Sequence, residues 1–411
     1  MALVRTASPR TPIAEVAQGP GSALGEAAAL WAHPDAGLRA AAFGEADRRE
    51  GASLRTVLSS LPMPDDLPEG LPGPWFGAAS FQGAPGADWR GFAPLRFTLP
   101  SLLAWTEGGR HFLAAFGDGA AARLDDARRK LDLPAPQRAR ASISARRLRR
   151  PDEKQRWEAL VARALAAIAS GALSKVVLAR AIEVECGAEI DTAVLLAALE
   201  ARYPACRAFL VRGSDGSAFL GATPEVLCRV EGDRVFTEAL AGSAQPGSAA
   251  ALLGSRKDLR EHRWVVDHIL AALSGLASGV VREPEPGLRT LANVVHLHTP
   301  ISARLAPGRS VADVAAALHP TPAVAGVPAG AALRFLAQHE QLDRGLYAGL
   351  VGWVGPGRAE LAVALRCALV RGSQARLFVG AGIVEGSAAE AEWAEMELKA
   401  RALLDALGVA P

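Results

Sequence analysis

The sequence predicts an α+β fold, and two observations lead to this prediction. Segments with the period-two alternation of strands come in adjacent pairs, such as 226–238, where Glu231-Gly232-Asp233 would form the turn of a hairpin. Segments with helical periodicity lie between these pairs but do not alternate with single strands, as they would in a Rossmann-type sheet. We therefore expect strand hairpins with helices packed against them.

The individual elements are clearest from residue 152 onward. Apolar residues from Trp157 to Ile168 recur at helical spacing, and Gly171 ends the run. The stretch 174–185 is rich in β-branched residues and alternates like a strand, and 258–274 carries the apolar stripe of a long helix. The other predicted elements are strands at 207–212 and 217–221, paired strands at 361–370 and 376–384 around Gly372-Ser373, and a last helix starting at Ser387 with a Ser387–Glu390 capping box.

Composition narrows the class of protein. The 411 residues are half apolar and can bury a large core. Lys and Arg (45) nearly balance Asp and Glu (43), so neither a nucleic acid nor another polyanion is an expected partner. No stretch approaches the roughly 20 apolar residues of a membrane span. No leader-like apolar run is present and the four cysteines are scattered, so we expect a cytoplasmic protein without disulfides or zinc.

The first 150 residues give weaker signals. They are rich in Gly, Pro and Ala and show little periodicity. The stretch 134–151, with six arginines, is strongly basic and is interpreted as a solvated connector.

Lys175 begins the strand at 174–185 and is a candidate acid–base group. Alternation places it on the same face as Val177, Ala179 and Ala181, which would leave room for a ligand. Burial disfavours the charged ammonium, so a lysine in such a pocket can act as a base. A strand-end lysine can also extend to water and carry no chemistry. The pattern alone leaves both interpretations open.

Three carboxylates on two helices could hold a hard cation. Glu261 lies four residues before Val265, beside the apolar stripe of its helix, where an unpaired carboxylate would be costly. On the last helix, Glu392, Glu395 and Lys399 share one face. Mg²⁺ suits a few carboxylates combined with substrate oxygens and water. Solvated helix ends explain the same residues without a metal.

Two further features could meet an anionic ligand. The segment 379–384 (VGAGIV) contains Gly380 and Gly382, where backbone amides could approach an anion, although a strand bulge would use the same glycines. It lacks the dinucleotide fingerprint. Arg366 alternates with apolar neighbours and would need a carboxylate from the substrate or from the protein.

Taken in order, these signals resemble the chorismate-utilising enzymes, which comprise the isochorismate, salicylate, anthranilate and aminodeoxychorismate synthases. The resemblance extends from about residue 155 to 405. It rests on nine segments: SKVVLAR (174–180), FLGATPEVL (219–227), TEALAGSAQPG (237–247), KDLREHRWVVDHI (257–269), VVHLHTP (294–300), LHPTPAVAGVP (318–328), DRGLYAGLVGW (343–353), ALRCALV (364–370) and VGAGIVEGS (379–387).

The resemblance implies a fold and a domain organisation. It implies large mixed and antiparallel sheets packed with helices, as in anthranilate synthase component I, and a single chorismate-binding domain over 1–411. Residues 1–150 would form a divergent N-terminal part and 152–407 the strongly matching catalytic part.

Within the family, the chain resembles the isochorismate synthases most. Anthranilate-type members have a Gln in place of Lys175, since ammonia attacks there, and aminodeoxychorismate synthases have a Lys in place of Ala241. Both differences imply water as the nucleophile. The block 319–328 also resembles isochorismate synthases more than salicylate synthases. Ser243 replaces a commoner Thr, and Val327 replaces an aromatic residue, which would alter the shape of the pocket.

The resemblance also implies roles for individual residues. Lys175 would take a proton from the water that attacks C2 of chorismate, and Glu225 would donate a proton to the departing C4 hydroxyl. Glu261, Glu392 and Glu395 would hold Mg²⁺ against the ring carboxylate. The implied substrate-binding residues are Gly242, Ser243, His296, Thr321, Tyr347, Arg366, Gly380 and Lys399.

Three alternatives stand beside this assignment. A salicylate synthase would add pyruvate elimination, and an anthranilate synthase component I would need ammonia from a glutaminase. A chorismate- or metal-binding protein without activity would leave chorismate unchanged. The resemblance implies a monomer without a glutaminase subunit, acting in menaquinone or siderophore biosynthesis.

Overall fold

The computed structural model describes residues 3–7, 24, 26–64, 67, 71–131, 144–292 and 294–409. Its helices are α2 (Leu54–Ser59), α3 (Ala120–Leu131), α4 (Glu153–Ala169), α5 (Thr192–Arg202), α6 (Ala249–Gly254), α7 (Arg256–Leu273), α8 (Val311–Leu318), α9 (Ala329–His339) and α10 (Ala389–Ala406). Its strands are β1 (Leu3–Ala7), β2 (Ala29–His33), β3 (Leu38–Phe43), β4 (Asp47–Glu50), β5 (Trp75–Ala79), β6 (Leu95–Leu99), β7 (Leu102–Glu107), β8 (Arg110–Ala115), β9 (Ala145–Leu148), β10 (Lys175–Cys186), β11 (Arg207–Arg212), β12 (Ala218–Thr223), β13 (Val226–Glu231), β14 (Arg234–Ala244), β15 (Ala277–Arg282), β16 (Gly287–Thr290), β17 (Val295–Leu305), β18 (Gly326–Val327), β19 (Leu350–Gly355), β20 (Arg358–Val363), β21 (Cys367–Arg371) and β22 (Gln374–Val384).

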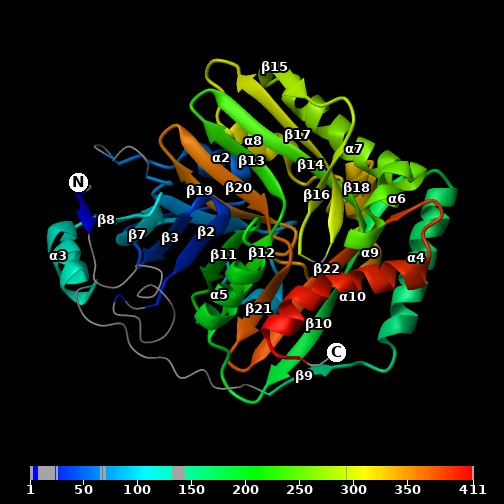
Figure 1. Ribbon diagram of the computed structural model, residues 1–411, viewed down its shortest axis with the longest axis horizontal. Coiled ribbons are helices and arrows are strands. Elements are labelled where there is room, and N and C mark those ends of the chain that lie inside the picture. Colours follow the sequence, from blue (N-terminus) through cyan, green and yellow to red (C-terminus); the bar gives the residue numbers. More distant parts are fainter. Residues whose placement is uncertain are drawn as a thin grey trace.

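The strands form two large sheets, and the pairings within them are antiparallel. One sheet has twelve strands in the order β1-β8-β7-β3-β2-β11-β12-β21-β22-β10-β18, with β9 also pairing with β10. The other has ten in the order β15-β17-β14-β13-β20-β19-β5-β6-β4, with β16 also pairing with β17. Figure 1 shows the helices packed around them. The predicted α+β class, with large antiparallel sheets packed with helices, is confirmed.

The first 150 residues contribute one end of each sheet. Strand β2 joins the larger sheet by pairing with β11, where Trp31 lies opposite Phe209. Strand β5 joins the other sheet by pairing with β19. The Trp89 ring stacks on Phe378 of β22 with ring centroids 5.4 Å apart. The N-terminal part is therefore built into the sheets that carry the later segments.

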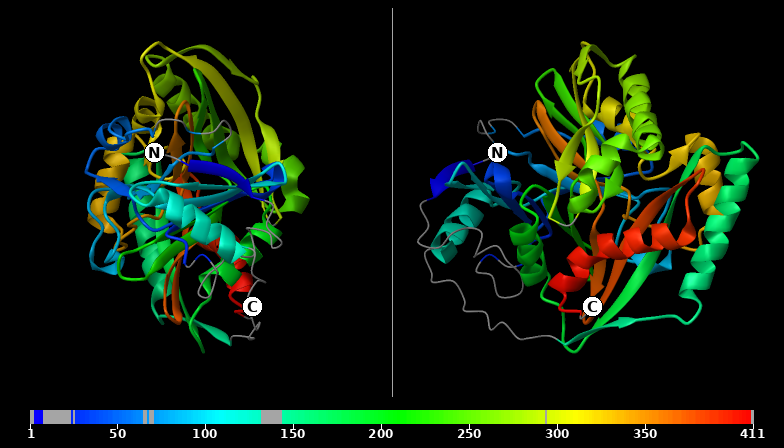
Figure 2. Two further views of the ribbon diagram at one scale, coloured as in Figure 1. Left: turned by 90° about the vertical axis from the view of Figure 1, so that its left-hand side faces the viewer. Right: turned by 45° about the vertical axis from the view of Figure 1, so that its right-hand side comes forward.

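Helices α7 and α10 lie against different sheets and meet near the middle of the molecule. The buried stripe of α7, which includes Val265 and Ile269, packs on β14, as its helical periodicity predicts. Helix α10 packs on β22 of the larger sheet and contacts α4 and α5. The right-hand view of Figure 2 shows α10 crossing below the end of α7. This arrangement brings their polar residues toward one another.

Two local predictions were wrong. The strand predicted over 361–370 is two strands, β20 and β21, because the intervening Arg366 has a φ of +49°, in the left-handed region that interrupts a strand. The predicted Ser387–Glu390 capping box is absent: α10 begins at Ala389 without a side-chain cap, and the Ser387 hydroxyl instead accepts a hydrogen bond from the Val384 amide at 3.2 Å.

The glycines of 379–384 occupy a regular strand. Register is kept along β10 and β22, with Ala179 opposite Gly380 and Val177 opposite Gly382. A bulge does occur elsewhere, between Ala241 and Ser243 of β14, where Gly242 has a φ of +76°. The bulge interpretation of the 379–384 glycines is therefore wrong.

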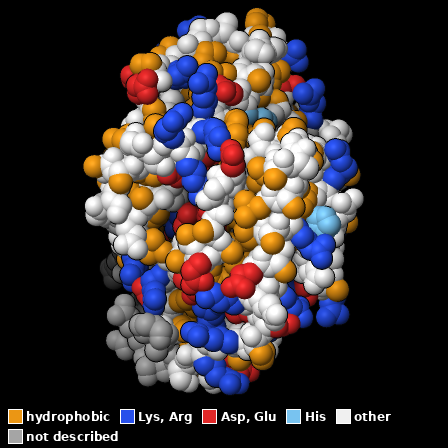
Figure 3. Space-filling view, turned by 90° about the vertical axis from the view of Figure 1, so that its right-hand side faces the viewer, with side chains coloured by type: hydrophobic (Ala, Val, Ile, Leu, Met, Phe, Trp, Pro, Cys, Tyr) orange, Lys and Arg blue, Asp and Glu red, His pale blue; other side chains and the backbone are white. Residues whose placement is uncertain are grey.

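The basic stretch is only partly described, since 134–143 lies outside the described residues. Arg146 and Arg147 belong to β9, and Arg147 is largely buried beside Glu153 and Glu397. This portion is an integral part of the sheet rather than a solvated connector. Elsewhere, Lys and Arg lie among Asp and Glu over the face shown in Figure 3, as the balanced charge predicts. Among the described helices, none has the length and apolar character that crossing a bilayer requires.

Candidate active site

A pocket with a cavity volume of about 110 Å³, open to solvent, lies between α7, α10 and the ends of strands from both sheets. Eleven of the residues singled out from the sequence line it: Glu225, Gly242, Ser243, Glu261, His296, Tyr347, Arg366, Gly380, Glu392, Glu395 and Lys399. Lys175 and Thr321 lie just behind the wall and contact two of these residues.

Lys175 is buried at the start of β10, with 1% of its side chain exposed. Its Nζ lies 2.7 Å from Oε1 of Glu261 on α7. A Cβ atom at Gly382 would lie 2.7 Å from the same Oε1 and 3.1 Å from Lys175 Cε, so a larger residue there would displace the Glu261 carboxylate. The interpretation of Lys175 as a solvated strand-end residue is therefore wrong, and its partner is a carboxylate that faces the pocket.

Glu225 lies between β12 and β13, and both its backbone amide and its backbone carbonyl form hydrogen bonds. Its amide donates to Thr223 Oγ1 at 3.3 Å, and its carbonyl accepts from the Val363 amide at 3.0 Å. The Thr321 hydroxyl donates to Glu225 Oε1 at 3.4 Å. Burial, assisted by the nearby Glu238 carboxylate and opposed by Lys175, raises the pKa of Glu225 to about 7. A carboxyl group of this kind can carry a proton near neutral pH.

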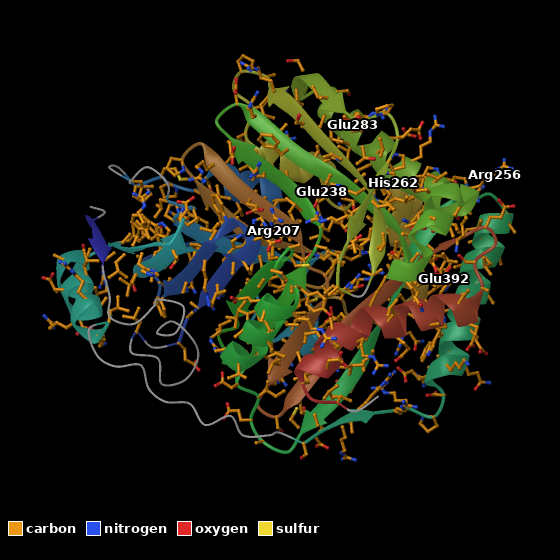
Figure 4. All side chains as sticks on the ribbon, in the orientation of Figure 1. Arg207, Glu238, Arg256, His262, Glu283 and Glu392 are labelled. Atoms are coloured by element: carbon orange, nitrogen blue, oxygen red, sulfur yellow. The ribbon has the colours of Figure 1, made fainter. Side chains whose placement is uncertain are left out.

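The other three glutamates of the pocket each contact a lysine. Besides the Lys175–Glu261 pair, Lys257 Nζ lies 2.9 Å from Glu392 Oε1 and Lys399 Nζ lies 2.6 Å from Glu395 Oε1. Burial raises the pKa of Glu392 although Lys257 opposes the rise. Burial acts in the same direction on Glu395, but Lys399 outweighs it and the pKa falls. Figure 4 shows Glu392 on α10 facing the region of α7 that carries His262.

The chemistry of this donor set suits a hard divalent cation, because three carboxylates from two helices open onto one pocket. Among the described residues, however, no three His, Cys, Asp or Glu side chains converge closely enough to form a ready-made metal cluster. The carboxylate oxygens are turned toward the lysines instead. The three carboxylates are suitable ligands for a divalent cation, but their oxygens would have to turn away from the lysines to bind it.

Arg366, His296 and Ser243 form a connected polar wall. The Arg366 guanidinium lies 3.5 Å from His296 Nε2, and Ser243 Oγ lies 2.9 Å from His296 Nδ1. Burial, followed by the charge of Arg366, lowers the pKa of His296 well below its usual value, so the ring is neutral. Arg366 takes part in none of the ion pairs found among the described residues. A buried guanidinium in that situation can bind a carboxylate ligand.

Tyr347 and Gly380 lie side by side on the opposite wall. The Tyr347 ring stacks on Phe378 with centroids 5.3 Å apart. A Cβ atom at Gly380 would lie 2.7 Å from the Tyr347 hydroxyl oxygen, so the glycine leaves that oxygen room. Lys399 donates to the Gly380 carbonyl at 3.0 Å as well as contacting Glu395. The glycines of 379–384 thus make space for side chains.

Sequence reasoning missed Lys257 and Glu238 as parts of the site. Lys257 lines the pocket and lies four residues before Glu261, so a signal existed: both fall on one face of the predicted helix. Glu238 lies behind Glu225, within the block TEALAGSAQPG, and no local pattern separates it from an ordinary strand carboxylate. Asp258, three residues before Glu261, also lines the pocket.

Comparison with known proteins places these features in a family. The family model described as chorismate binding enzyme matches residues 31–408. The salicylate biosynthesis isochorismate synthase of Pseudomonas aeruginosa is 37% identical over 343 residues, covering 78% of this chain and 70% of that protein. Isochorismate synthase EntC of Escherichia coli K12 is 39% identical over 266 residues, covering 62% of this chain and 68% of that protein.

Solved structures show the same fold. The menaquinone-specific isochorismate synthase MenF of Escherichia coli superposes with a TM-score of 0.82 at 26% identity, covering 99% of this chain and 94% of that one. Anthranilate synthase component I of Streptococcus pneumoniae gives a TM-score of 0.77 at 20% identity over 90% and 92% of the two chains, a likeness of fold alone. The family match spans nearly the whole chain, which therefore belongs to the chorismate-binding enzymes.

Proposed function

We propose that this enzyme is an isochorismate synthase, which adds water at C2 of chorismate and releases the C4 hydroxyl as water. The observation that carries the proposal is the combination of Lys175 and Glu225 at one pocket: Glu225 lines it, and Lys175 contacts Glu261, which also lines it. Relatives named isochorismate synthase support the choice of reaction.

Glu225 would supply the proton that the leaving hydroxyl needs. Its buried carboxyl has a pKa raised to about 7, so a substantial fraction carries a proton at neutral pH. A positioned general acid contributes roughly 10²–10⁴-fold to the rate. The backbone hydrogen bonds on both sides of Glu225 hold it in place for this role.

Lys175 would take the proton of the attacking water. Its position at the pocket wall is set by the pairing of β10 with β22 and β18. The Lys175 amine contacts the Glu261 carboxylate at 2.7 Å, so Lys175 would reach the attacking water only while Glu261 has another partner. A Gln at this position could not act as a base, and this difference favours water over ammonia as the nucleophile.

The wall residues would orient the substrate carboxylates. Arg366 offers a buried guanidinium, and Tyr347 with the Gly380 backbone borders the same space, a setting suited to the enolpyruvyl carboxylate. His296, neutral and bonded to Ser243, would donate or accept one hydrogen bond without adding charge. These contacts would hold the ring in a fixed orientation toward Lys175 and Glu225.

We also propose Mg²⁺ as the cofactor, held by Glu261, Glu392 and Glu395. When bound it would act as a Lewis acid toward the ring carboxylate. The observation in support is that these three carboxylates open onto the pocket that Glu225 lines. We further propose that the enzyme acts without a glutaminase subunit. We also propose a cytoplasmic location, which agrees with the four free cysteines.

A product assay tests the proposed function. Chorismate incubated with the enzyme and Mg²⁺ should give isochorismate, without salicylate, and the rate should not depend on ammonia. Salicylate as the main product would assign the chain to salicylate synthases, and ammonia-dependent anthranilate fluorescence would assign it to anthranilate synthases. Unaltered chorismate after long incubation would favour a binding protein.

A further inference from the structure

Glu238 lies behind the catalytic acid, on β14, and its side chain is largely buried, with 13% exposed. Arg289 of β16 donates to both its oxygens at 2.8 Å. His298 of β17 contacts Oε2 at 2.8 Å. Burial raises the pKa of Glu238, but His298 and Arg289 outweigh burial and the pKa falls below its usual value. This carboxylate is therefore held in its ionised form.

The same carboxylate reaches the backbone next to Glu225. The amide of Val226 donates to Glu238 Oε1 at 3.2 Å. Val226 begins β13, directly after Glu225, and the register of β13 against β20 shifts just beyond it. The regular backbone hydrogen bonds between paired strands are interrupted at such an irregularity, so they do not hold the chain in place there. The Glu238 carboxylate supplies a hydrogen bond at this position, next to those made by the backbone groups of Glu225.

Two buried carboxyl groups this close do not both ionise readily, and their surroundings decide which one keeps the proton. Glu238 has Arg289 and His298 in contact, whereas the Glu225 carboxyl accepts a hydrogen bond from the neutral Thr321 hydroxyl. The charged groups that act on Glu225 are Glu238 from β14 and Lys175 from β10. The charge is thus placed on Glu238 and the proton on Glu225.

We propose that Glu238 is a positioning residue for Glu225, whose buried charge keeps the Glu225 carboxyl protonated and whose hydrogen bond fixes the start of β13. Glu238 does not line the pocket, so it acts through Glu225 and not on the substrate. In Figure 4 Glu238 is labelled in the sheet region, away from the Glu392 end of the pocket. This inference rests on the proposed function, because it assigns Glu225 the role of general acid.

The test is the pH profile of Glu238→Gln. Gln retains most of the shape but removes the charge, so the loss of kcat/KM on the alkaline side should begin about one pH unit lower than in the wild type. At pH 8 this corresponds to roughly tenfold lower activity, with KM for chorismate little changed. Glu360→Gln is the matched control: Glu360 is also buried in the sheet and paired with an arginine, Arg207, at 2.8 Å. Its alkaline limb should coincide with that of the wild type.

Glu238→Asp separates charge from position. It keeps the charge but withdraws the carboxylate from the Val226 amide, so the alkaline limb should stay near the wild-type pH while kcat falls. An unmoved limb in Glu238→Gln would overturn the inference, as would a limb that moves equally in Glu360→Gln. If Glu238→Gln does not fold, Glu238→Asp with wild-type kcat would overturn it. Inactive wild-type enzyme would instead overturn the proposed function.

Discussion

The two ends of the pocket hold carboxyl groups in opposite electrostatic settings. At one end Glu225 is buried beside the Thr321 hydroxyl, and its pKa is raised to about 7. At the other end Glu261, Glu392 and Glu395 each lie between 2.6 and 2.9 Å from a lysine ammonium. The same type of side chain can therefore donate a proton at one end and hold a cation at the other.

The difference arises from the elements that surround each end. Glu225 is enclosed by strands of the sheets and faces a buried carboxylate, Glu238, so the charged form is disfavoured. The second end is formed by α7 and α10, whose lysines and carboxylates line the pocket together: Lys257 and Glu261 from α7, and Glu392, Glu395 and Lys399 from α10. The separation of roles follows from burial and from the placement of cations.

The largest expected effect concerns the proton-donating end. Glu225→Gln removes the general acid while keeping the side-chain volume, so kcat should fall by roughly 10²–10⁴-fold. Mg²⁺ binding, measured by calorimetry, should remain. Glu231→Gln, at the exposed end of the strand β13 that follows Glu225, is the control and should behave like the wild type. Wild-type turnover in Glu225→Gln would place the acid elsewhere.

The next effect concerns the cation-binding end. Glu395→Gln should weaken Mg²⁺ binding by at least about 10–100-fold, the loss typical when a metal ligand loses even a supporting contact. The Mg²⁺ concentration that gives half-maximal activity should rise accordingly. Glu385→Gln removes an exposed carboxylate paired with Arg260 and should leave the Mg²⁺ dependence unchanged. An unaltered Mg²⁺ requirement in Glu395→Gln would remove that residue from the proposed metal site.

The two ends should also respond differently to pH. Because Glu225 must carry a proton to act, kcat/KM should decline as pH rises through about 7, the value to which burial raises its pKa. Above that point the decline should approach about tenfold per pH unit. Glu395, whose pKa is lowered by Lys399, stays charged over this range, so Mg²⁺ binding should not weaken. Activity that rises from pH 7 to 9 would exclude Glu225 as the acid.

The smallest expected effect concerns Lys257, which forms an ion pair with Glu392. Its side chain is 39% exposed, so the pair is screened by water and is worth no more than about 1 kcal/mol. Lys257→Gln removes this competitor and should tighten Mg²⁺ binding up to roughly fivefold, as a thermal shift with increasing Mg²⁺ would report. Weaker Mg²⁺ binding would mean that Lys257 holds Glu392 in its binding position.

Much of the fold could be predicted from periodicity. The strand expected at 174–185 is Lys175–Cys186, and the helix expected at 258–274 is Arg256–Leu273, because alternation and the apolar stripe are local signals. The break at Arg366 was not predictable, since its left-handed backbone interrupts a segment that alternates like a continuous strand. Tertiary pairing, and not local pattern, determines that position.

The candidate site shows the same division. The sequence segments that resemble the family indicated most residues that line the pocket, because each segment contains residue types typical of that family. The lysine partners were not predictable: Lys257 and Glu392 are 135 positions apart, and their contact exists only once α7 and α10 meet. The engagement of Glu238 by Arg289 and His298 likewise needs three strands to be in register.

The most direct test of the central claim is to follow the oxygen atoms of the reaction. Chorismate turned over with Mg²⁺ in H₂¹⁸O should give isochorismate with one ¹⁸O atom in its C2 hydroxyl, because water attacks C2 and the original C4 hydroxyl departs protonated by Glu225. Mass spectrometry of the product reads this directly. Isochorismate without label, with the C4 oxygen retained, would contradict water activation by Lys175 and proton donation by Glu225 together.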